Sequence, residues 1–195
     1  MITGIILSGG QSSRMGKNKS LLLYEGKPII AYVVEAIRSF VKDVMVITNE
    51  PEFYSFLENV TFKEDIIKGK GPMGGIYTGL HYAETDLSFV VACDMPFIKG
   101  ELIPFLEKRI GDAWGCIPFD GEYFETLAAL YNKELEGFFY SFLKGEIKKL
   151  QYLLKGLNVV RVDDRIIYKE FGKHIFYNMN TQESYEKIKR ETSNE

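Results

Sequence analysis

In the first half of the chain, short apolar runs alternate with segments whose apolar positions recur at helical spacing. The apolar runs predict strands at Ile5–Leu7, Val44–Thr48, Thr61–Lys63 and Leu87–Cys93. The helical spacing predicts helices at Pro28–Phe40, Pro51–Leu57, Ile76–Ala83 and Glu101–Ile110. Pro28 suits a helix start, and five apolar residues after it share one face: Ile29, Ile30, Val33, Val34 and Ile37. This alternation predicts an α/β fold with a mainly parallel sheet flanked by helices.

The second half continues with strands at Ala113–Pro118, Thr126–Asn132 and Val159–Val162, and with helices at Leu135–Leu143, Ile147–Leu154 and Gln182–Arg190. The strand after the turn-rich segment Phe119–Phe124 runs either parallel or antiparallel to its neighbours, and the sequence leaves both open. The aromatic side chains of Phe138–Phe142 lie near helical spacing, which predicts core packing. No repeat, low-complexity tract or linker divides the chain. Residues 1–195 are therefore expected to form one Rossmann-like domain.

The composition and charge of the chain limit the kinds of ligand and partner that are expected. A chain of 195 residues with 46% hydrophobic residues can bury a sizeable core, and a net charge of −3 gives no sign of nucleic-acid binding. Two cysteines, Cys93 and Cys116, argue against a disulfide framework, and His81 and His174 are expected in surface or packing positions. The sequence shows no basic leader with a cleavage site, and no apolar run approaches about 18 residues. We expect a soluble cytoplasmic protein with no membrane or nucleic-acid partner.

The segment 4–23 carries the strongest chemical signal, because an apolar strand runs there into a loop rich in glycine, serine and cations. Glycines let the backbone bring its N–H groups close to a phosphate, and cations on the same loop add positive charge. The glycines are Gly9, Gly10 and Gly16, and the cations are Arg14, Lys17 and Lys19. The loop is not a Walker A loop, because five residues separate Gly10 from Gly16 and Asn18 follows Lys17. We expect a small phosphate-bearing ligand here.

Polar residues follow four predicted strands where each strand ends: Ser8, Asn49, Asp65 and Asp94. The carboxyl ends of parallel strands meet at one edge of a sheet, so these residues can face one cleft. Asp94 follows the most apolar strand, and Mg²⁺ binds through one or two carboxylates together with substrate phosphates. We therefore expect Asp94 to bind Mg²⁺ rather than to cap the next helix, which begins several residues later.

A second glycine cluster, Gly71–Gly75, ends the loop-like stretch that begins at Asp65. It is either a plain turn into the predicted helix Ile76–Ala83 or a place where a base or ribose approaches the backbone. Asp65 is either an exposed turn residue or the acceptor for the ring N–H and amino group of guanine. Asn49 and Asn180 are either loop caps or hydrogen-bonding partners of a ribose or a second substrate.

Five segments, spread over almost the whole chain, form an ordered set of motifs. They are residues 7–19 (LSGGQSSRMGKNK), 22–30 (LLYEGKPII), 71–76 (GPMGGI), 93–97 (CDMPF) and 176–183 (FYNMNTQE). The first resembles the Leu-x-Gly-Gly-x-x-x-Arg-Met-Gly-x-x-Lys signature of nucleotidyltransferases with the glycosyltransferase-A-like fold. The combination of all five is similar to the molybdenum-cofactor guanylyltransferase family.

The resemblance implies transfer of GMP from GTP to molybdopterin, with Mg²⁺ as cofactor and pyrophosphate as the second product. It implies a nucleotide-binding half, residues 1–110, and an acceptor-binding half, residues 111–195. Asp94 would hold Mg²⁺, Arg14 would neutralise the departing pyrophosphate, and Asn180 would help to hold the pterin. The other binding residues it implies are Leu7, Ser8, Gly9, Gly10, Lys19, Asn49, Asp65, Gly71 and Gly75. It also implies transient contact with other proteins of molybdenum-cofactor biosynthesis or with recipient enzymes.

The residue types present also suit nucleotidyl transfer when they are considered apart from the family resemblance. The attacking phosphate oxygen is already an anion, so the reaction needs positioning and charge neutralisation rather than a strong general base. Arg14, Lys19 and the Mg²⁺ expected at Asp94 supply that charge. The sequence offers no Ser/His/Asp or Cys/His set for nucleophilic catalysis, as this mechanism predicts.

The chain departs from the family pattern at several positions. Ser8 stands where alanine is usual, Met73-Gly74 replaces Leu-Ala, and Gln182 replaces proline. The segment Phe119–Thr126 lacks the His-Pro or similar pair that relatives often carry. The alternatives are a cytidylyltransferase for the same cofactor, a sugar-phosphate nucleotidyltransferase and a non-catalytic nucleotide-binding relative. The Gly71–Gly75 motif favours guanine over cytosine, and the lack of proline before Lys19 argues against the sugar-phosphate enzymes.

Overall fold

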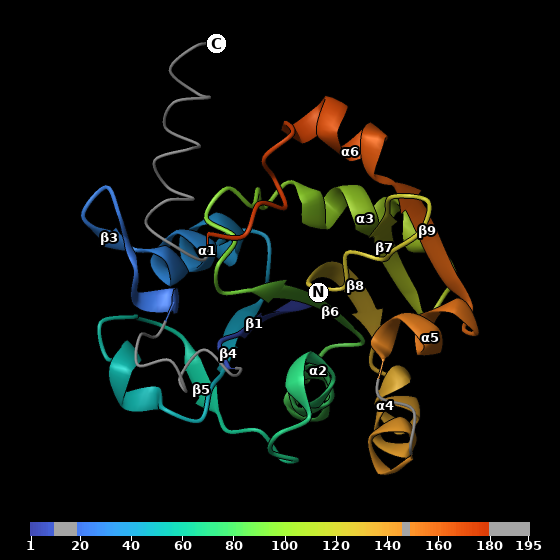
Figure 1. The fold of residues 1–195 in the computed structure, drawn as a ribbon, viewed down its shortest axis with the longest axis horizontal. Helices are drawn as coiled ribbons and strands as arrows, with labels where there is room; N and C mark the ends of the chain where they lie inside the picture. The colour runs from blue at the N-terminus through green and yellow to red at the C-terminus, as the bar shows by residue number, and fades with distance from the viewer. Residues whose placement is uncertain (10–18, 146–148, 180–195) are drawn as a thin grey trace.

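A seven-stranded sheet lies at the centre of the computed structural model, which describes residues 1–9, 19–145 and 149–179 (Figure 1). The strand order is β5-β4-β1-β6-β8-β7-β9. The strands are β1 (Ile2–Leu7), β4 (Asp43–Ile47), β5 (Thr61–Lys63), β6 (Leu87–Ala92), β7 (Gly115–Phe119), β8 (Ala128–Asn132) and β9 (Val159–Asp163). Within this sheet β8 pairs antiparallel with both neighbours, and the other pairs are parallel. The predicted α/β fold is confirmed, and the strand after Phe124 is the antiparallel one.

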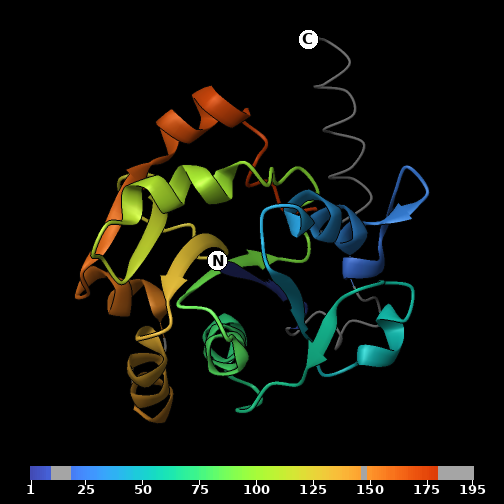
Figure 2. The same cartoon turned by 180° about the vertical axis from the view of Figure 1, so that it is seen from behind.

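Helices cover both faces of the sheet, with α1, α3 and α6 on one face and α2 and α4 on the other (Figures 1 and 2). The helices are α1 (Ile29–Arg38), α2 (Gly71–Tyr82), α3 (Leu102–Ile110), α4 (Leu135–Lys144), α5 (Leu150–Lys155) and α6 (Asp164–Phe171). Two 3₁₀ helices, η2 (Lys19–Leu21) and η3 (Pro51–Tyr54), and a hairpin of β2 (Leu23–Tyr24) and β3 (Lys27–Pro28) join these elements. None of the described helices is long and apolar enough to cross a membrane.

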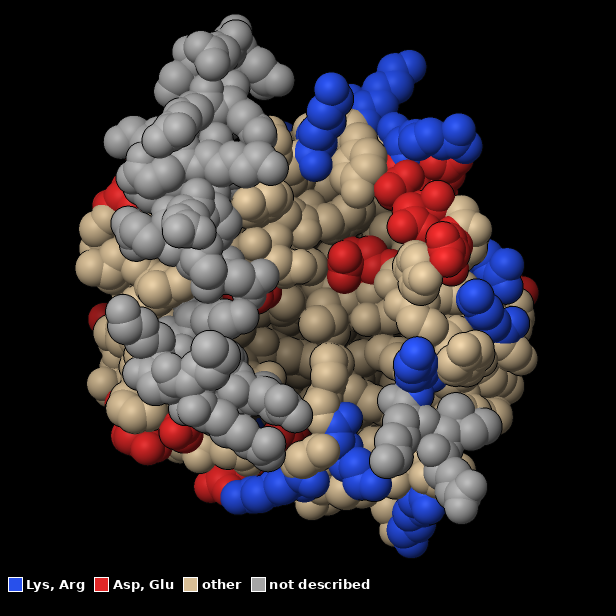
Figure 3. Space-filling view, in the orientation of Figure 1, with Lys and Arg blue, Asp and Glu red and all other residues tan. Residues whose placement is uncertain are grey.

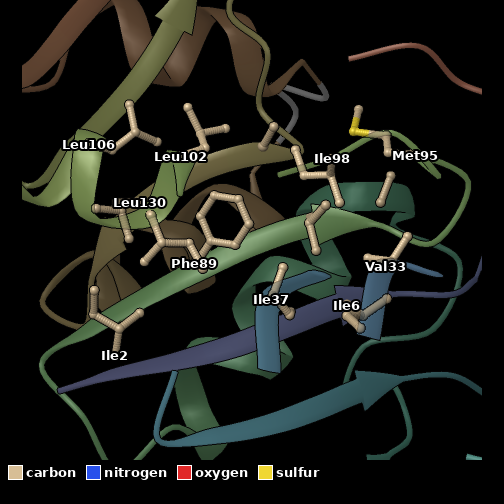
Figure 4. Packing of buried hydrophobic residues seen from close by; sticks show 14 of the residues in the cluster. Ile2, Ile6, Val33, Ile37, Phe89, Met95, Ile98, Leu102, Leu106 and Leu130 are labelled. Carbon is tan, nitrogen blue, oxygen red and sulfur yellow. The ribbon is translucent and has the colours of Figure 1, made fainter. Parts of the chain in front are cut away.

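Two hydrophobic cores fill the space between the sheet and the helices. On the face of α1, α3 and α6, Phe89 of β6 packs with Val33, Ile37 and Leu106, and all four side chains are fully buried (Figure 4). The next residue, Val90, enters the other core, together with side chains of α2, α4 and α5. Successive residues of a strand point to opposite faces, so a central strand covered on both sides is mostly apolar. β6 lies in the middle of the sheet and follows this rule except at Ser88, which is fully buried.

Helix α1 agrees closely with its prediction. Its five buried side chains are those expected from the helical spacing: Ile29, Ile30, Val33, Val34 and Ile37. Pro28 immediately precedes the helix, and its lack of an N–H is harmless there, because the first N–H groups of a helix have no partner within the helix. The amphipathic pattern therefore fixed both the position of this helix and the face that it buries.

Helix α2 begins at Gly71, five residues before the predicted start at Ile76, so the expectation of a loop over 71–75 is wrong. Pro72 stands in the first turn of the helix, where proline is well tolerated. The glycines serve close packing, because a Cβ on Gly79 would lie 2.6 Å from Ile5 Cγ2. Glycine lowers the intrinsic helix propensity, but here it lets the helix approach β1 closely.

Some of the shorter elements and the aromatic segment differ from what the sequence predicts. Helix α6 and the β2–β3 hairpin were not predicted, although Asp163 caps α6 by accepting a hydrogen bond from Arg165 N. In the aromatic segment Phe138–Phe142, Phe139 is fully buried as expected, whereas Phe138 and Tyr140 are each 39% exposed. The predicted helix Gln182–Arg190 lies outside the described residues.

Candidate functional site

The carboxyl ends of β1, β4, β5 and β6 lie at one edge of the sheet, where backbone hydrogen bonds continue past the strands. These bonds run from Ser8 N to Ile47 O (2.9 Å), from Thr48 N to Lys63 O (2.9 Å) and from Cys93 N to Leu7 O (3.1 Å). Four predicted site residues follow these strands within one or two positions: Ser8, Asn49, Asp65 and Asp94. The topology therefore brings them to a common edge, as parallel α/β sheets do for ligands.

Asn49 and Asp65 form a pair joined by two hydrogen bonds. Asn49 Nδ2 donates to Asp65 Oδ2 at 3.0 Å, and Asp65 N donates to Asn49 Oδ1 at 3.3 Å. The other carboxylate oxygen, Asp65 Oδ1, is buried and has no hydrogen-bond partner among the described residues. Burial raises the pKa of Asp65, while the bond from Asn49 and the charge of Lys68 oppose that shift. A buried acceptor without a donor is unfavourable, so this oxygen is suited to an N–H group of a ligand.

The Asp65 carboxylate lies against the start of the glycine-rich loop, because a Cβ on Gly9 would be 3.9 Å from Asp65 Oδ2. Gly9 is exposed, whereas the side chains of Leu7 and Ser8 are buried. Gly9 is therefore more accessible to a ligand at this edge than Leu7 and Ser8, the two residues that precede it. Thr78 of α2 fixes the following backbone, since its Oγ1 accepts a hydrogen bond from Ile66 N at 3.0 Å.

The second glycine cluster holds α2 against the strand that leads into the loop. A Cβ on Gly75 would lie 3.0 Å from Leu7 Cδ2, so Gly75 faces the Leu7 side chain. Gly71 has φ of +60°, a backbone conformation that favours glycine, and it is exposed at the first turn of the helix. Gly75 thus has a packing reason for being glycine, and Gly71 has a conformational one. Contact of either residue with a ligand stays a prediction.

Asp94 lies at the end of β6 and is half-buried. The chain returns to it near the C-terminus, where Met179 N donates to the Asp94 carbonyl oxygen at 2.8 Å. This bond brings residues 176–179, the described part of the FYNMNTQE motif, to the same edge of the sheet. Among the described residues no group of three or more His, Cys, Asp or Glu side chains is placed to hold a metal ion. Asp94 is therefore not part of a complete metal-binding cluster of described residues, and a carboxylate in this position suits an ion that is also held by phosphates.

Glu125 is a residue of this edge that the sequence did not single out. Ala92 N donates to Leu127 O at 3.1 Å, which draws the start of β8 against the end of β6. Glu125 Oε1 accepts a hydrogen bond from Leu127 N at 3.2 Å. Burial raises the pKa of Glu125, and the charges of Asp94 and Asp120 raise it further. A second carboxylate therefore lies near Asp94 at this edge.

A pocket of about 510 Å³ opens between the segment after Asp94 and the end of α6. Lys99 and Lys173 are exposed cations in its lining, and Phe97, Tyr168 and His174 provide ring surface. Figure 3 shows the matching charge pattern, with basic side chains along α6 and acidic side chains gathered where β9 passes into it. The pocket therefore combines flat apolar surface with positive charge.

The remaining predicted residues cannot be placed in this edge. Gly10, Arg14 and Asn180 lie outside the described residues, and so does the side chain of Lys19, whose backbone begins η2. The histidines behave as expected from their isolation. His81 Nδ1 lies 2.7 Å from Glu136 Oε1 on the surface between α2 and α4, and His174 is half-buried beside Tyr177.

Comparison with known proteins gives the same family as the motifs. The sequence profile of the MobA-like NTP transferase domain matches residues 4–159. A protein of Peptoclostridium acidaminophilum named as a probable molybdenum cofactor guanylyltransferase is 33% identical, over 99% of this chain and 90% of its own. A molybdenum cofactor guanylyltransferase of Syntrophotalea carbinolica is 30% identical, over 97% of this chain and 91% of its own.

Solved structures agree with these sequence comparisons. The crystal structure of molybdopterin-guanine dinucleotide biosynthesis protein A from Archaeoglobus fulgidus superposes with a TM-score of 0.81 at 27% identity, and each chain is covered completely. The 2-C-methyl-D-erythritol 4-phosphate cytidylyltransferase of Thermus thermophilus, at 13% identity and a TM-score of 0.68, shares the fold over 99% of this chain and all of its own. The predicted family resemblance and the prediction of a nucleotidyltransferase are confirmed.

Proposed function

Because the chain belongs to the family of MobA-like NTP transferases, we propose that it transfers GMP from GTP to molybdopterin and releases pyrophosphate. The observation that carries the guanine assignment is the Asp65 carboxylate, held by Asn49 on one oxygen and buried without a described partner on the other. The guanylyltransferase names of the relatives support molybdopterin as the acceptor.

Guanine recognition follows from the pattern of donors on the base. Guanine presents a ring N–H beside an amino group, and one carboxylate accepts from both. Adenine and cytosine place an acceptor beside the amino group, so neither offers this pair. In the proposed site Asn49 orients the carboxylate, and the nucleotide lies along Leu7, Ser8, Gly9 and Gly10, with Gly71 and Gly75 beyond the base.

The transfer itself is an in-line displacement. An anionic oxygen of the molybdopterin phosphate attacks the α-phosphorus of GTP, and a new phosphorus–oxygen bond forms. The bond between the α-phosphorus and the oxygen that bridges to the β-phosphate breaks, and pyrophosphate leaves with that electron pair. Arg14 and Lys19 are proposed to neutralise the charge that builds up on pyrophosphate. We therefore expect the protein to bind and orient the substrates without having to move a proton.

The half-buried Asp94 carboxylate suits a magnesium ion carried by the nucleotide, because it lies at the end of a central strand. When bound, Mg²⁺ would act as a Lewis acid and offset the negative charge of the phosphates. Asp94 would hold and orient the ion, and the carboxylate would be ionised for that purpose.

On the acceptor side, we assign molybdopterin to the pocket between Lys99 and Lys173. Asn180, which lies outside the described residues, is proposed to help to hold the pterin. A flat pterin suits Phe97 and Tyr168, and an anionic acceptor suits the two lysines. Residues 1–110 then bind the nucleotide and residues 111–195 bind most of the acceptor. Both cysteines are unpaired, in keeping with a cytoplasmic reaction.

Pyrophosphate release in the presence of GTP, Mg²⁺ and molybdenum-loaded molybdopterin tests the proposal. Asp94→Asn should lower kcat by about 100-fold or more, because it removes a charge that acts on the transition state. Asp112→Asn, an exposed carboxylate in the turn after α3, is the matched control and should leave kcat unchanged. Full activity of Asp94→Asn would refute its assignment to the metal.

A further inference from the structure

The hydroxyl group of Tyr54 lies between two serine hydroxyls at the edge that carries the site. Ser8 Oγ is 2.6 Å from Tyr54 Oη, and Ser20 Oγ is 2.8 Å from the same atom. All three residues are buried, with exposed fractions of 6% for Ser8, 1% for Ser20 and 0% for Tyr54. They come from three elements, since Ser8 follows β1, Ser20 lies in η2 and Tyr54 ends η3. One phenol oxygen therefore bridges two parts of the chain.

Aromatic packing fixes the position of the Tyr54 ring and therefore of its hydroxyl group. The Tyr54 ring stacks on Phe62 of β5 with centroids 6.4 Å apart and also meets Phe56. Ser8 is fixed through its own backbone, because Ser8 N donates to Ile47 O at 2.9 Å. The residue before Ser8 is tied to the end of β6, because Cys93 N donates to Leu7 O at 3.1 Å. The hydroxyl groups thus connect η2 and η3 to the residue that follows β1.

The two serines border the segment on which the nucleotide assignment rests. Ser8 precedes Gly9, and Ser20 follows Lys19, so both ends of the glycine- and cation-bearing segment are bound to one phenol oxygen. Ser8 stands where the family pattern has alanine, so this chain gives Tyr54 a partner that the pattern lacks. The departure at position 8 therefore has a structural counterpart in this chain.

We propose that Tyr54 is a positioning residue of the nucleotide site, whose hydroxyl group fixes Ser8 and Ser20 relative to each other and thereby raises the affinity for GTP. The inference rests on the proposed function. Groups that are fixed before the ligand arrives do not have to be ordered on binding, and the saved entropy appears as affinity. Loss of the bridge should weaken GTP binding more than it slows the chemical step at saturating GTP.

Tyr54→Phe removes the oxygen and keeps the ring, so it tests the bridge directly. Calorimetric titration of the whole protein with GTP and Mg²⁺ should give a Kd about tenfold higher than that of the wild type. With saturating GTP, kcat should stay within about threefold of the wild type. In the Ser8→Ala background the effect of Tyr54→Phe on Kd should shrink, because the two substitutions remove the same hydrogen bond.

Tyr131→Phe is the matched control, because Tyr131 is equally buried and its hydroxyl donates to Thr126 O at 2.9 Å. It should lower the melting temperature without changing the Kd for GTP. Ser20→Ala tests the same bridge without touching the aromatic packing, and it serves if Tyr54→Phe does not fold. A Kd within about twofold of the wild type in Tyr54→Phe, or in Ser20→Ala if that variant has to serve, overturns the inference. A wild-type protein that does not bind GTP overturns the proposed function instead.

Discussion

Asn49 donates a hydrogen bond of 3.0 Å to Asp65 Oδ2, so the residue after β4 orients the carboxylate after β5. The two strands are parallel neighbours in register from Met45 and Thr61 onward, which places the two loops side by side. One oxygen of the carboxylate is therefore held by the protein, and the other is buried without a described partner. Guanine would supply the donors that this oxygen lacks.

Replacing Asp65 with asparagine should remove guanine selectivity, because an amide cannot accept from both N–H groups of the base. We expect kcat/KM for GTP to fall by about 100-fold, as when a buried polar group of a site loses its partner. Inosine triphosphate lacks the amino group, so the wild type should prefer GTP to it by about tenfold, and Asp65→Asn should lose that preference. Steady-state kinetics with both nucleotides measures the change, and an unchanged preference would count against the base contact.

The raised pKa of Asp65 predicts a pH dependence with a definite sign. The folded protein binds this proton more tightly than the unfolded chain does, so the associated stability is complete below the usual pKa of 3.8 and is lost as the pH rises through the raised value. Relative to Asp65→Asn, the unfolding free energy of the wild type should therefore fall as the pH rises from below 3.8 through the raised pKa. GTP affinity should change in the opposite direction, because the base needs the ionised carboxylate.

Urea unfolding and GTP titrations over this pH range measure both effects. Asp65→Asn is the control for the titration of GTP itself. GTP titrates in the same way with both proteins, so a difference between their pH profiles comes from the Asp65 carboxylate. Equal pH profiles for the wild type and the variant would contradict the assignment.

The two lysines of the acceptor pocket should affect the acceptor and not the nucleotide. The double substitution Lys99→Gln and Lys173→Gln should raise KM for molybdopterin by about tenfold, because it removes two positive charges near an anion. The Kd for GTP should stay unchanged. Lys108→Gln, an exposed lysine in the last turn of α3, is the control. A change in GTP affinity without a change in acceptor KM would place the acceptor elsewhere.

The close contact between α2 and β1 predicts that a single methyl group added at Gly79 lowers the free energy of unfolding strongly. In Gly79→Ala the new Cβ would lie 2.6 Å from the Cγ2 of Ile5, which is fully buried. We expect a loss of about 1–3 kcal/mol in the free energy of unfolding, as for other overpacked cores. Gly137→Ala in α4 meets nothing within 4 Å and should be neutral or stabilising by up to about 1 kcal/mol. Urea denaturation compares the two, and equal stabilities would contradict the packing argument.

The sequence was sufficient to predict an element where its hydrophobic pattern corresponds directly to the faces that the element buries. The strands buried on both faces are mostly apolar runs, with Thr3 and Ser88 as buried polar exceptions, and α1 shows one apolar stripe. It was insufficient for α2, because glycine was interpreted from its local propensity, whereas contact with β1 determines its role. Helix α6 has only eight residues and begins with two charged ones, so its apolar side is short. Short elements of this kind depend on tertiary packing more than on pattern.

The same distinction holds for the site. Residues at strand ends could be predicted, because topology places all parallel ends at one edge. Tyr54 and Glu125 could not, since each acts through a partner that is distant in the sequence. Tyr54 is separated from Ser8 by 46 positions, and Glu125 is drawn to the edge through the bond from Ala92 to Leu127. A tyrosine in an aromatic-rich segment carries no sequence signal that its hydroxyl bridges two serines.

The most direct test of the central claim is the identity of the transferred nucleotide. The protein is incubated with molybdenum-loaded molybdopterin, Mg²⁺ and equal concentrations of α-labelled GTP and CTP, and the dinucleotide products are separated and counted. The account predicts labelled molybdopterin guanine dinucleotide, formed in a one-to-one ratio with pyrophosphate, and a strong excess over the cytosine product. A cytosine dinucleotide as the main product, or GTP binding without any transfer to molybdopterin, would contradict it.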